Sequence, residues 1–438
     1  MGLGQGRALR RNRDILGTPF GRGSGRLRAM RPEPSATTDQ SIPTRRRHLS
    51  ALDGLRGVAI IGVLLFHTGH QAGGFLGVDL FFVLSGYLIT GLLLREIEAT
   101  GRVRLISFWG RRLRRLLPAL ALMLVGVTLL VRAVGSSGLV RSTLADGPWV
   151  QANLVNWHLL ASSAGYWDRF GADRVFGHLW SIAVEEQFYL LWPLLLALVA
   201  LRGTRTRAGT PVAVLTASLA AASVLAMALL VDPSDPTRVY TGTDTRAFSL
   251  LLGALAATPS VRHLSSRLAE RSPRALTTVS ATAAAVIAGL WLLADGTASP
   301  WLYPGGLVAH ALACAVLISL SARSPRDPVS RVLSWEPLRW TGLISYSLYL
   351  WHWPVIVLLS PEATGLTGWW WTSAVVAVSI GLAAASTHLV ENPIRFHASW
   401  ATGRRGAIAF AAVMVALAVL WVALPAPPPP SVDVTALD

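Results

Sequence analysis

Long apolar runs recur along the sequence, separated by short polar segments, and each is close to the ~20 residues that a helix needs to cross a bilayer. The run at 149–160 is too short and too polar to cross, and we expect it outside the membrane or flat on its surface. The sixth run is short. The pattern predicts an all-α polytopic transmembrane bundle of about eleven spans, at residues 51–70, 75–94, 116–134, 178–201, 211–231, 245–258, 275–294, 301–321, 341–360, 369–390 and 406–424.

Composition supports a membrane protein. Of the 438 residues, 52% are hydrophobic and only 14% are charged, whereas soluble domains carry roughly 25% charged residues. The single cysteine, Cys314, excludes a disulfide framework and a cysteine-built zinc site, and we predict no metal. The net charge of +16 would fit nucleic acid, but the basic residues lie between apolar runs. We therefore expect no nucleic-acid partner and a lipid bilayer instead.

The arginines predict the orientation. All 39 basic residues are arginine, and 32 of them lie before the first span or in alternate loops. Because short cytoplasmic loops carry excess Arg, we expect the N-terminus inside and the C-terminus outside. Residues 1–47 lack apolar periodicity and are expected to be a disordered cytoplasmic segment. Residues 425–438 are expected to form an external Pro-rich tail.

The first span carries Arg56 and His67, eleven residues apart. Eleven residues turn a helix by about 1100°, only ~20° past three turns, so both side chains share one face with ~16 Å between them along the axis. An Arg reaching the inner surface and a His at the outer interface would explain the pair without chemistry. The alternative is functional, because an imidazole within a span can act as a general base at neutral pH.

The second span places Asp79 near its outer end and Ser85 and Gly86 near its middle. Gly86 favours close helix approach. Asp79 either faces outer water or pairs with an Arg or His on another helix.

The fourth span has a polar stripe. His178, Ser181 and Glu185 are spaced i, i+3 and i+7, and Glu186 follows directly. The two carboxylates lie ~11 Å from the outer end, where neighbouring carboxylates cannot both stay ionised cheaply. Chance is a poor explanation for such a stripe within a span.

Two further segments are rich in polar groups. Four arginines directly precede the third span, and they fit either topogenic charge and anionic lipid or a clamp for phosphates. The ninth span carries the series Tyr346, Tyr349 and His352. We interpret Glu391 and Arg395, at the end of the tenth span, as a structural pair that Pro393 can interrupt. The four arginines are Arg111, Arg112, Arg114 and Arg115.

These segments together resemble the acyltransferase-3 family of integral-membrane O-acyltransferases. The spacing of Arg56 and His67 matches the family's basic residue, ten residues and His. The other matching segments, in order, are LDGLRG, GVDLFFVLSGYLI, RRLRRLLPA, HLWSIAVEEQFYLLWP, SYSLYLWHWP and ENPIR. The resemblance covers residues 48–400 and implies a ten-helix catalytic domain there. The helix at 401–424 is then an additional C-terminal span.

The resemblance implies an enzyme of the bacterial plasma membrane that moves an acyl group, in most members acetyl, from cytoplasmic acyl-CoA to a hydroxyl of a surface glycan, glycolipid or exported small molecule. Acyl-CoA is a co-substrate, and no permanently bound cofactor is implied. Longer members continue into an external hydrolase domain that this sequence does not contain, and a separate external partner could replace it. A proton-coupled transporter or lipid-linked-sugar flippase is the alternative.

The resemblance also implies roles for residues. The catalytic candidates are His67, Arg56, Glu185 and Ser181. His67 is the expected base, Glu185 is expected to orient its ring, and a covalent intermediate on Ser181 or His67 is the less favoured route. Arg56 would stabilise either the developing negative charge or the donor's phosphates. The acyl-CoA candidates are Arg111, Arg112 and Arg115, and the acceptor-side or supporting candidates are Asp79, Ser85, His178, Glu186, Tyr346, Tyr349 and His352.

Overall fold

The computed structural model describes residues 50–162, 167, 174–202 and 209–428 of the chain. Every regular element within these residues is a helix, which confirms the all-α prediction. The predicted disorder of residues 1–47 and the end of the predicted tail, from residue 429, lie outside the described residues.

Nine segments of the described chain are long and apolar enough to cross a membrane, and each overlaps a predicted span. Their helical cores are α1, α2, α3, α6, α7, α11, α12, α17 and α18. The segments are Ser50–His67, Ala72–Thr100, Leu105–Val134, Gly177–Leu201, Gly209–Leu230, Pro273–Leu293, Gly306–Arg323, Gly368–His397 and Gly403–Ala423.

The two remaining predicted spans are helical but shorter. Helix α9 (Thr243–Ala256) and helix α15 (Ser345–Leu358) have 14 residues each, fewer than the ~20 that cross a bilayer. A break at Ile344 separates α15 from α14 (Glu336–Leu343). Both 14-residue helices are largely buried against their neighbours, so each is held by protein contacts along most of its length.

The third span begins earlier than predicted. Helix α2 (Leu76–Thr100) runs on past the predicted end of its span, and α3 (Leu105–Val134) starts after only four residues. The arginine run at 111–115 therefore lies within α3 and not in a loop before it. Arginine and leucine are good helix formers, and a hydropathy window hides a helical turn that is rich in arginine.

The segment after α3 also differs from prediction. Residues 149–160 fall on the end of α4 (Ser137–Gln151) and on α5 (Val155–Ala161). The Gln151 side chain donates to the carbonyl of Met414, halfway along α18, and accepts from the indole of Trp421. This segment therefore folds back along the spans and does not lie beyond them.

Helix α17 (Gly368–Ala385) continues into two π-helical segments, Ser386–Glu391 and Pro393–His397. Pro393 does not end the helical path, which reaches His397. Proline has no backbone N–H for the hydrogen bond to the carbonyl four residues earlier, and the wider π turn does not use that hydrogen bond. Such turns often mark functional positions.

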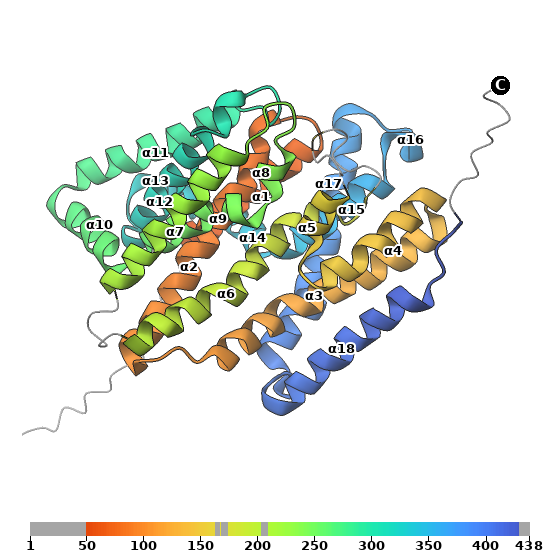
Figure 1. Ribbon diagram of the computed structural model, residues 1–438. Helices are drawn as coiled ribbons and strands as arrows, with labels where there is room; N and C mark the ends of the chain where they lie inside the picture. The colour runs from red at the N-terminus through yellow and green to blue at the C-terminus, as the bar shows by residue number, and fades with distance from the viewer. Residues whose placement is uncertain (1–49, 163–166, 168–173, 203–208, 429–438) are drawn as a thin grey trace, which may run out of the picture. The chain divides into compact units, whose positions relative to one another are not determined.

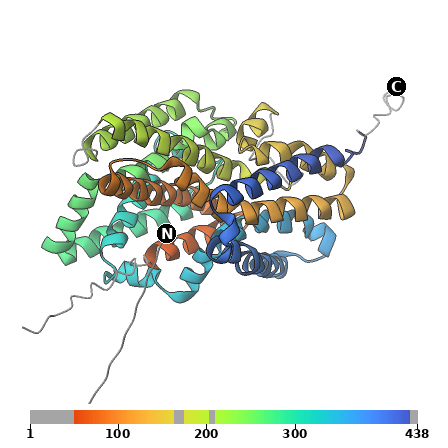
Figure 2. The same ribbon diagram turned by 90° about the horizontal axis from the view of Figure 1, so that it is seen from below.

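The helices lie side by side, with α18 against α3 and α4 along one edge of the bundle (Figures 1 and 2). Pairs α2 and α9, α7 and α9, and α15 and α17 also pack together. The remaining helices are α6 (Trp180–Arg202), α7 (Gly209–Leu230), α8 (Thr237–Thr241), α10 (Pro259–Arg271), α11 (Pro273–Leu293), α12 (Gly306–Arg323), α13 (Pro328–Leu333), α16 (Pro361–Thr364) and α18 (Gly403–Ala423). Short 3-10 turns cover Ala72–Phe75, Gly177–Leu179, Pro300–Leu302 and Ser399–Ala401.

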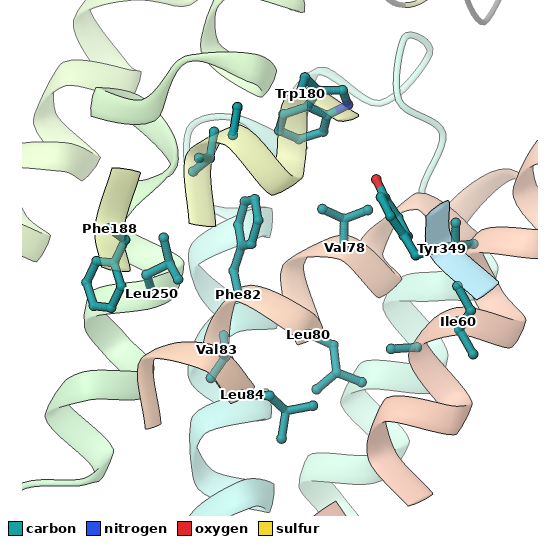
Figure 3. Close-up of a cluster of buried hydrophobic side chains, with 14 of the residues drawn as sticks. Ile60, Val78, Leu80, Phe82, Val83, Leu84, Trp180, Phe188, Leu250 and Tyr349 are labelled. Atoms are coloured by element: carbon teal, nitrogen blue, oxygen red, sulfur yellow. The ribbon is translucent and has the colours of Figure 1, made fainter. Parts of the chain in front are cut away.

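One continuous apolar cluster joins the central helices. Figure 3 shows side chains of α1, α2, α6, α9 and α15 meeting in it, among them Ile60, Phe82, Trp180 and Leu250. Tyr349 on α15 borders the cluster with its ring. The polar residues of these helices are therefore held by a packed core.

Glycines allow the backbones of two helix pairs, α2 with α9 and α1 with α14, to touch. A Cβ on Gly86 of α2 would lie 1.8 Å from the carbonyl oxygen of Leu250 on α9, which supports the predicted role of this glycine. Between α1 and α14, a Cβ on Gly57 would lie 2.1 Å from the carbonyl oxygen of Leu338, and one on Gly342 would lie 1.8 Å from that of Asp53. Any larger residue would force these helices apart.

Candidate active site

Helix α1 carries Arg56 and His67, and each of them meets its own group of polar side chains. Arg56 interacts electrostatically with Arg115 of α3 and Glu185 of α6, and His67 contacts His352 of α15. The predicted ~16 Å axial spacing thus separates two polar groupings. We call them the arginine end (Arg56, Arg112, Arg115, Glu185, Glu186 and Tyr346) and the imidazole end (His67, His178, His352, Ser181 and Tyr349).

Three rings meet at the imidazole end. His67 Nδ1 lies 3.0 Å from His352 Nε2. The ring of His178 lies edge-on to that of His352, with 5.3 Å between centroids, and the ring of Trp353 lies 4.8 Å from that of His67. His352 is buried, whereas His67 is partly exposed. The structure therefore brings together three histidines that lie far apart in the sequence.

The hydrogen bonds around His352 assign the tautomer of His67. His352 Nδ1 lies 2.7 Å from the carbonyl oxygen of Tyr349 and 3.2 Å from that of Leu348, so this nitrogen carries the hydrogen. In a neutral imidazole the other nitrogen then accepts. His67 Nδ1 must donate to it, which leaves the lone pair of His67 on Nε2.

Ser181 belongs to the imidazole end but does not contact an imidazole through its hydroxyl. The Tyr349 hydroxyl donates to the carbonyl oxygen of His178 (2.9 Å), so it accepts from Ser181 Oγ, 2.6 Å away. A serine nucleophile needs a base on its proton. The proton of Ser181 goes to a phenol, so the arrangement gives no support to a covalent intermediate on this residue.

Glu185 lies at the arginine end. Its carboxylate accepts from Ser85 at 2.7 Å and from Tyr189 at 3.3 Å, and the Tyr189 hydroxyl also donates to Ser85 at 2.9 Å. The guanidinium of Arg112 lies 4.4 Å above the Tyr189 ring. This cluster joins α2, α3 and α6.

The prediction that Glu185 orients His67 is therefore wrong. Glu185 is about one turn beyond Ser181 on α6, ~6 Å farther along the axis, which brings it to the level of the arginines. The side chain that lies against His67 Nδ1 is that of His352, at 3.0 Å. Sequence spacing alone could not show which of the two faces His67, because that depends on how α1, α6 and α15 are packed.

Arg115 occupies the centre of the arginine end. It interacts electrostatically with Arg56, Arg112, Arg395 and Glu391. Arg395 Nη1 lies 3.7 Å from Glu391, which is buried. The π turn that follows α17 thus delivers an acidic and a basic residue to this end, and the pair that we interpreted as only structural belongs to the candidate site.

Tyr346 and Glu186 complete this end. The Tyr346 hydroxyl donates to the carbonyl oxygen of Leu116 at 3.0 Å, and the same hydroxyl lies within electrostatic range of Glu186. Glu186 in turn interacts with Arg112 and Arg115. Tyr189 and Glu391 were missed as site residues. Tyr189 could have been found, because it lies four residues after Glu185 and so on the same face of α6.

The four arginines of α3 form two pairs, each three residues apart, and the two pairs lie about a quarter turn from each other around the helix. Arg112 and Arg115 interact with the carboxylate of Glu186 at the arginine end. Arg111 is half-exposed, 3.9 Å from Glu96, and together with Arg114 it lines a groove beside that end. The donor-binding role of Arg111, Arg112 and Arg115 stays a prediction.

Asp79, predicted as an acceptor-side or supporting residue, lies in a cluster of its own. Its Oδ1 accepts from Arg246 at 2.8 Å and from Ser249, and its Oδ2 lies 2.8 Å from His310 Nδ1. The Trp291 indole donates to His310 Nε2, so His310 Nδ1 carries the hydrogen and donates to Asp79. We call Asp79, Arg246, Ser249 and His310 the aspartate cluster. None of its members belongs to the site described above.

The aspartate cluster ties α2 to α9 and α12. The guanidinium of Arg246 is surrounded by the rings of Phe82, Tyr240 and Phe248, at 5.1 to 5.8 Å. Pairing with an Arg or His on another helix was one of the two predicted environments of Asp79, and the structure has both partners. Arg246 and His310 were missed as partners, because Arg246 lies in a short span and His310 in an otherwise apolar one.

Within the described chain, no group of three or more His, Cys, Asp or Glu side chains is arranged to hold a metal ion. A family model described as an acyltransferase domain matches residues 49–388. The chain belongs to this acyltransferase family. The matched range contains both ends of the site and the aspartate cluster, whereas α18 lies beyond it.

Curated relatives support the same family. The chain is 38% identical to a putative peptidoglycan O-acetyltransferase of Bacillus subtilis and 36% identical to the peptidoglycan O-acetyltransferase of Listeria monocytogenes. It is 34% identical to an O-acetyltransferase of Staphylococcus aureus. Each match covers 80% of this acyltransferase-family chain but only 55% to 57% of the relative. No solved structure matches it.

Proposed function

We propose that the protein transfers an acetyl group from acyl-CoA to a hydroxyl of a cell-envelope glycan of the peptidoglycan type. The observation that carries the proposal is the pairing of an arginine end and an imidazole end along one face of α1, with α6 and α15 contributing to both. The names of the relatives favour acetyl and peptidoglycan. The excess of arginine near the arginine end favours a cytoplasmic orientation for it.

The arginine end is suited to the donor. Arg112 and Arg115 offer planar guanidinium groups, which bind phosphates through paired hydrogen bonds. Arg56 interacts with Arg115 and Glu185 at this end. Since ~16 Å separates it from His67 along α1, we assign Arg56 to the donor's phosphates or thiol arm and not to the charge that develops beside His67.

The imidazole end is suited to proton transfer. The acceptor hydroxyl gives its proton to His67 Nε2 while its oxygen attacks the thioester carbonyl. The carbon–sulfur bond then breaks, the acetyl group stays on the acceptor oxygen as an ester, and the sulfur leaves as CoA thiolate. The thiolate takes up a proton, and His67 returns its own to solvent.

His352 positions His67 and does not itself contact the reacting atoms. Its Nε2 accepts from His67 Nδ1, and its Nδ1 is held by the carbonyls of Tyr349 and Leu348. The hydrogen bond at one imidazole nitrogen determines which nitrogen is left to act as a base. This arrangement keeps Nε2 of His67 unprotonated before each cycle.

The test is reconstitution of the full chain in lipid vesicles with isotope-labelled acetyl-CoA and soluble peptidoglycan fragments. We expect the glycan to gain the mass of one labelled acetyl ester and CoA to be released in equal amount. Folded wild-type protein that forms no acetylated glycan or other acetylated hydroxyl would contradict the proposal. Movement of glycan across the vesicle membrane without a change in mass would indicate the transporter alternative.

A further inference from the structure

A second candidate binding region lies between α3 and α18, about a quarter turn around α3 from the face that carries Arg112 and Arg115. It is a groove of about 710 Å³. Its walls are mostly apolar, with Leu117 and Ala121 on α3 and Phe410 and Val413 on α18. The groove contains none of the residues that define the two ends of the proposed acyl-transfer site, and its α18 wall lies outside the part of the chain that matches the family model.

The groove lies at the periphery of the bundle. Only 11% of the apolar window of α18 is buried, the lowest share among the nine candidate spans of the described chain. In a membrane the surroundings of such a helix are lipid tails. A groove of this kind is filled favourably by hydrocarbon and poorly by water.

One end of the groove is basic. Arg111 and Arg114 line it there, and the apolar wall of α3 continues from them to Ala121, ~15 Å along the helix axis. Two further arginines, at positions 404 and 405, lie in the first turn of α18, between groove residues Gly403 and Gly406. Within the part of the chain that the structure describes, the ion pair of this set is that of Arg111 with Glu96, at 3.9 Å. A cationic end followed by an apolar slot complements an anionic headgroup followed by an acyl chain.

We propose that this groove binds one anionic phospholipid of the bilayer, with its phosphate at Arg111 and Arg114 and an acyl chain between α3 and α18. The proposal gives Arg111 and Arg114, which line the groove, a ligand of their own. It also gives α18 a partner along the stretch where it does not touch the rest of the protein. The proposal is independent of the acyl-transfer reaction.

The test measures bound lipid and does not depend on activity. The full chain is purified in mild detergent, its lipid is identified by native mass spectrometry, and its melting temperature is recorded with added phosphatidylglycerol or phosphatidylcholine. We expect about one retained phosphatidylglycerol per chain and a higher melting temperature with that lipid only. Arg111→Gln combined with Arg114→Gln should weaken retention roughly 30-fold, since each arginine near an anionic headgroup contributes about fivefold in affinity.

Two further variants separate this site from general surface charge. Arg267→Gln with Arg271→Gln removes the same charge from exposed positions on α10 and should leave lipid retention unchanged. Ala409→Phe fills the groove without changing charge and should reduce retention. Equal retention by the α3 double variant, equal retention of phosphatidylcholine, or recovery of acyl-CoA from the groove instead of lipid would overturn the proposal.

Discussion

The aspartate cluster and the imidazole end are both polar groupings within the membrane-spanning bundle, and they differ in the exposure of their side chains and in the charge of the groups that are paired. In the aspartate cluster both carboxylate oxygens have partners, and Asp79, Arg246 and His310 have side chains that are at most 1% exposed. At the imidazole end, His67 is partly exposed and its partner is a second neutral imidazole.

This difference separates structural from chemical roles. Burial of an ion pair with aromatic rings around it holds α2, α9 and α12 in one arrangement, but it leaves no group to take up a proton. A base has to keep a lone pair directed toward a reactant. A charged residue within a span is thus a candidate for function, and the use of its hydrogen bonds decides between the two roles.

The strongest test of the contrast is His67→Ala. We expect the rate of acetyl transfer to fall about 100- to 10,000-fold, the usual contribution of a general base, with the melting temperature close to that of the wild type. Turnover of labelled acetyl-CoA by reconstituted protein measures the rate, and a thermal scan measures the melting temperature. Wild-type turnover by this variant would remove His67 from the mechanism.

Asp79→Leu should lower the stability of the fold, in contrast to His67→Ala, which should lower the rate. Removing one partner of a buried ion pair costs about 3–5 kcal/mol, because Arg246 is left buried without its counter-charge. We expect a lower melting temperature and a poor yield of folded protein. Combining the change with Arg246→Met should recover much of the loss, since apolar side chains can replace a whole pair. A stable Asp79→Leu protein without turnover would move this residue into the chemistry.

His352→Ala tests the assigned tautomer. Loss of the acceptor for His67 Nδ1 should lower the rate about 10- to 100-fold, in the range seen when a group that orients a functional histidine is removed. His352→Gln supplies a side-chain amide oxygen that can accept from His67 Nδ1 in place of Nε2. This variant should retain much of the activity. If the glutamine and alanine variants were equally slow, the hydrogen bond would not be what matters.

Arg112→Gln tests the arginine end with the smallest expected effect. A charge-assisted hydrogen bond contributes about 1.5–3 kcal/mol, so the KM for acetyl-CoA should rise at least about tenfold while kcat changes less. The same substitution at Arg111, which lines the groove between α3 and α18, should raise KM less. Arg267→Gln on α10 is the control for loss of charge. A larger effect at Arg111 than at Arg112 would reverse the assignment of the two faces.

The sequence predicted what depends on a single helix. The spacing of Arg56 and His67 on α1, and of Ser181 and Glu185 on α6, follows from the 3.6-residue period, although the level of Glu185 relative to His67 does not. Nine predicted spans are also present as long apolar helices. These features need no knowledge of neighbouring helices.

What depends on packing could not be predicted. The pairing of His67 with His352 joins residues 285 positions apart, and the partners of Asp79 lie 167 to 231 positions away. The early start of α3 was hidden because arginine lowers hydropathy but favours helix. The π turn at Glu391 depends on local hydrogen bonding, which the apolar pattern does not record.

The close contact of α1 with α14 has a consequence for selectivity. The interval from Arg56 to His67 is fixed at ~16 Å by the rise of helix α1, and the backbone contacts at Gly57 and Gly342 hold α1 against α14, so that α1 cannot slide along this neighbour. A thioester anchored at Arg56 would present its carbonyl at His67, whatever its acyl group. Tolerance for longer acyl groups would then be decided by the room beyond His67 and Trp353, and enlarging that space is where a change of donor would begin.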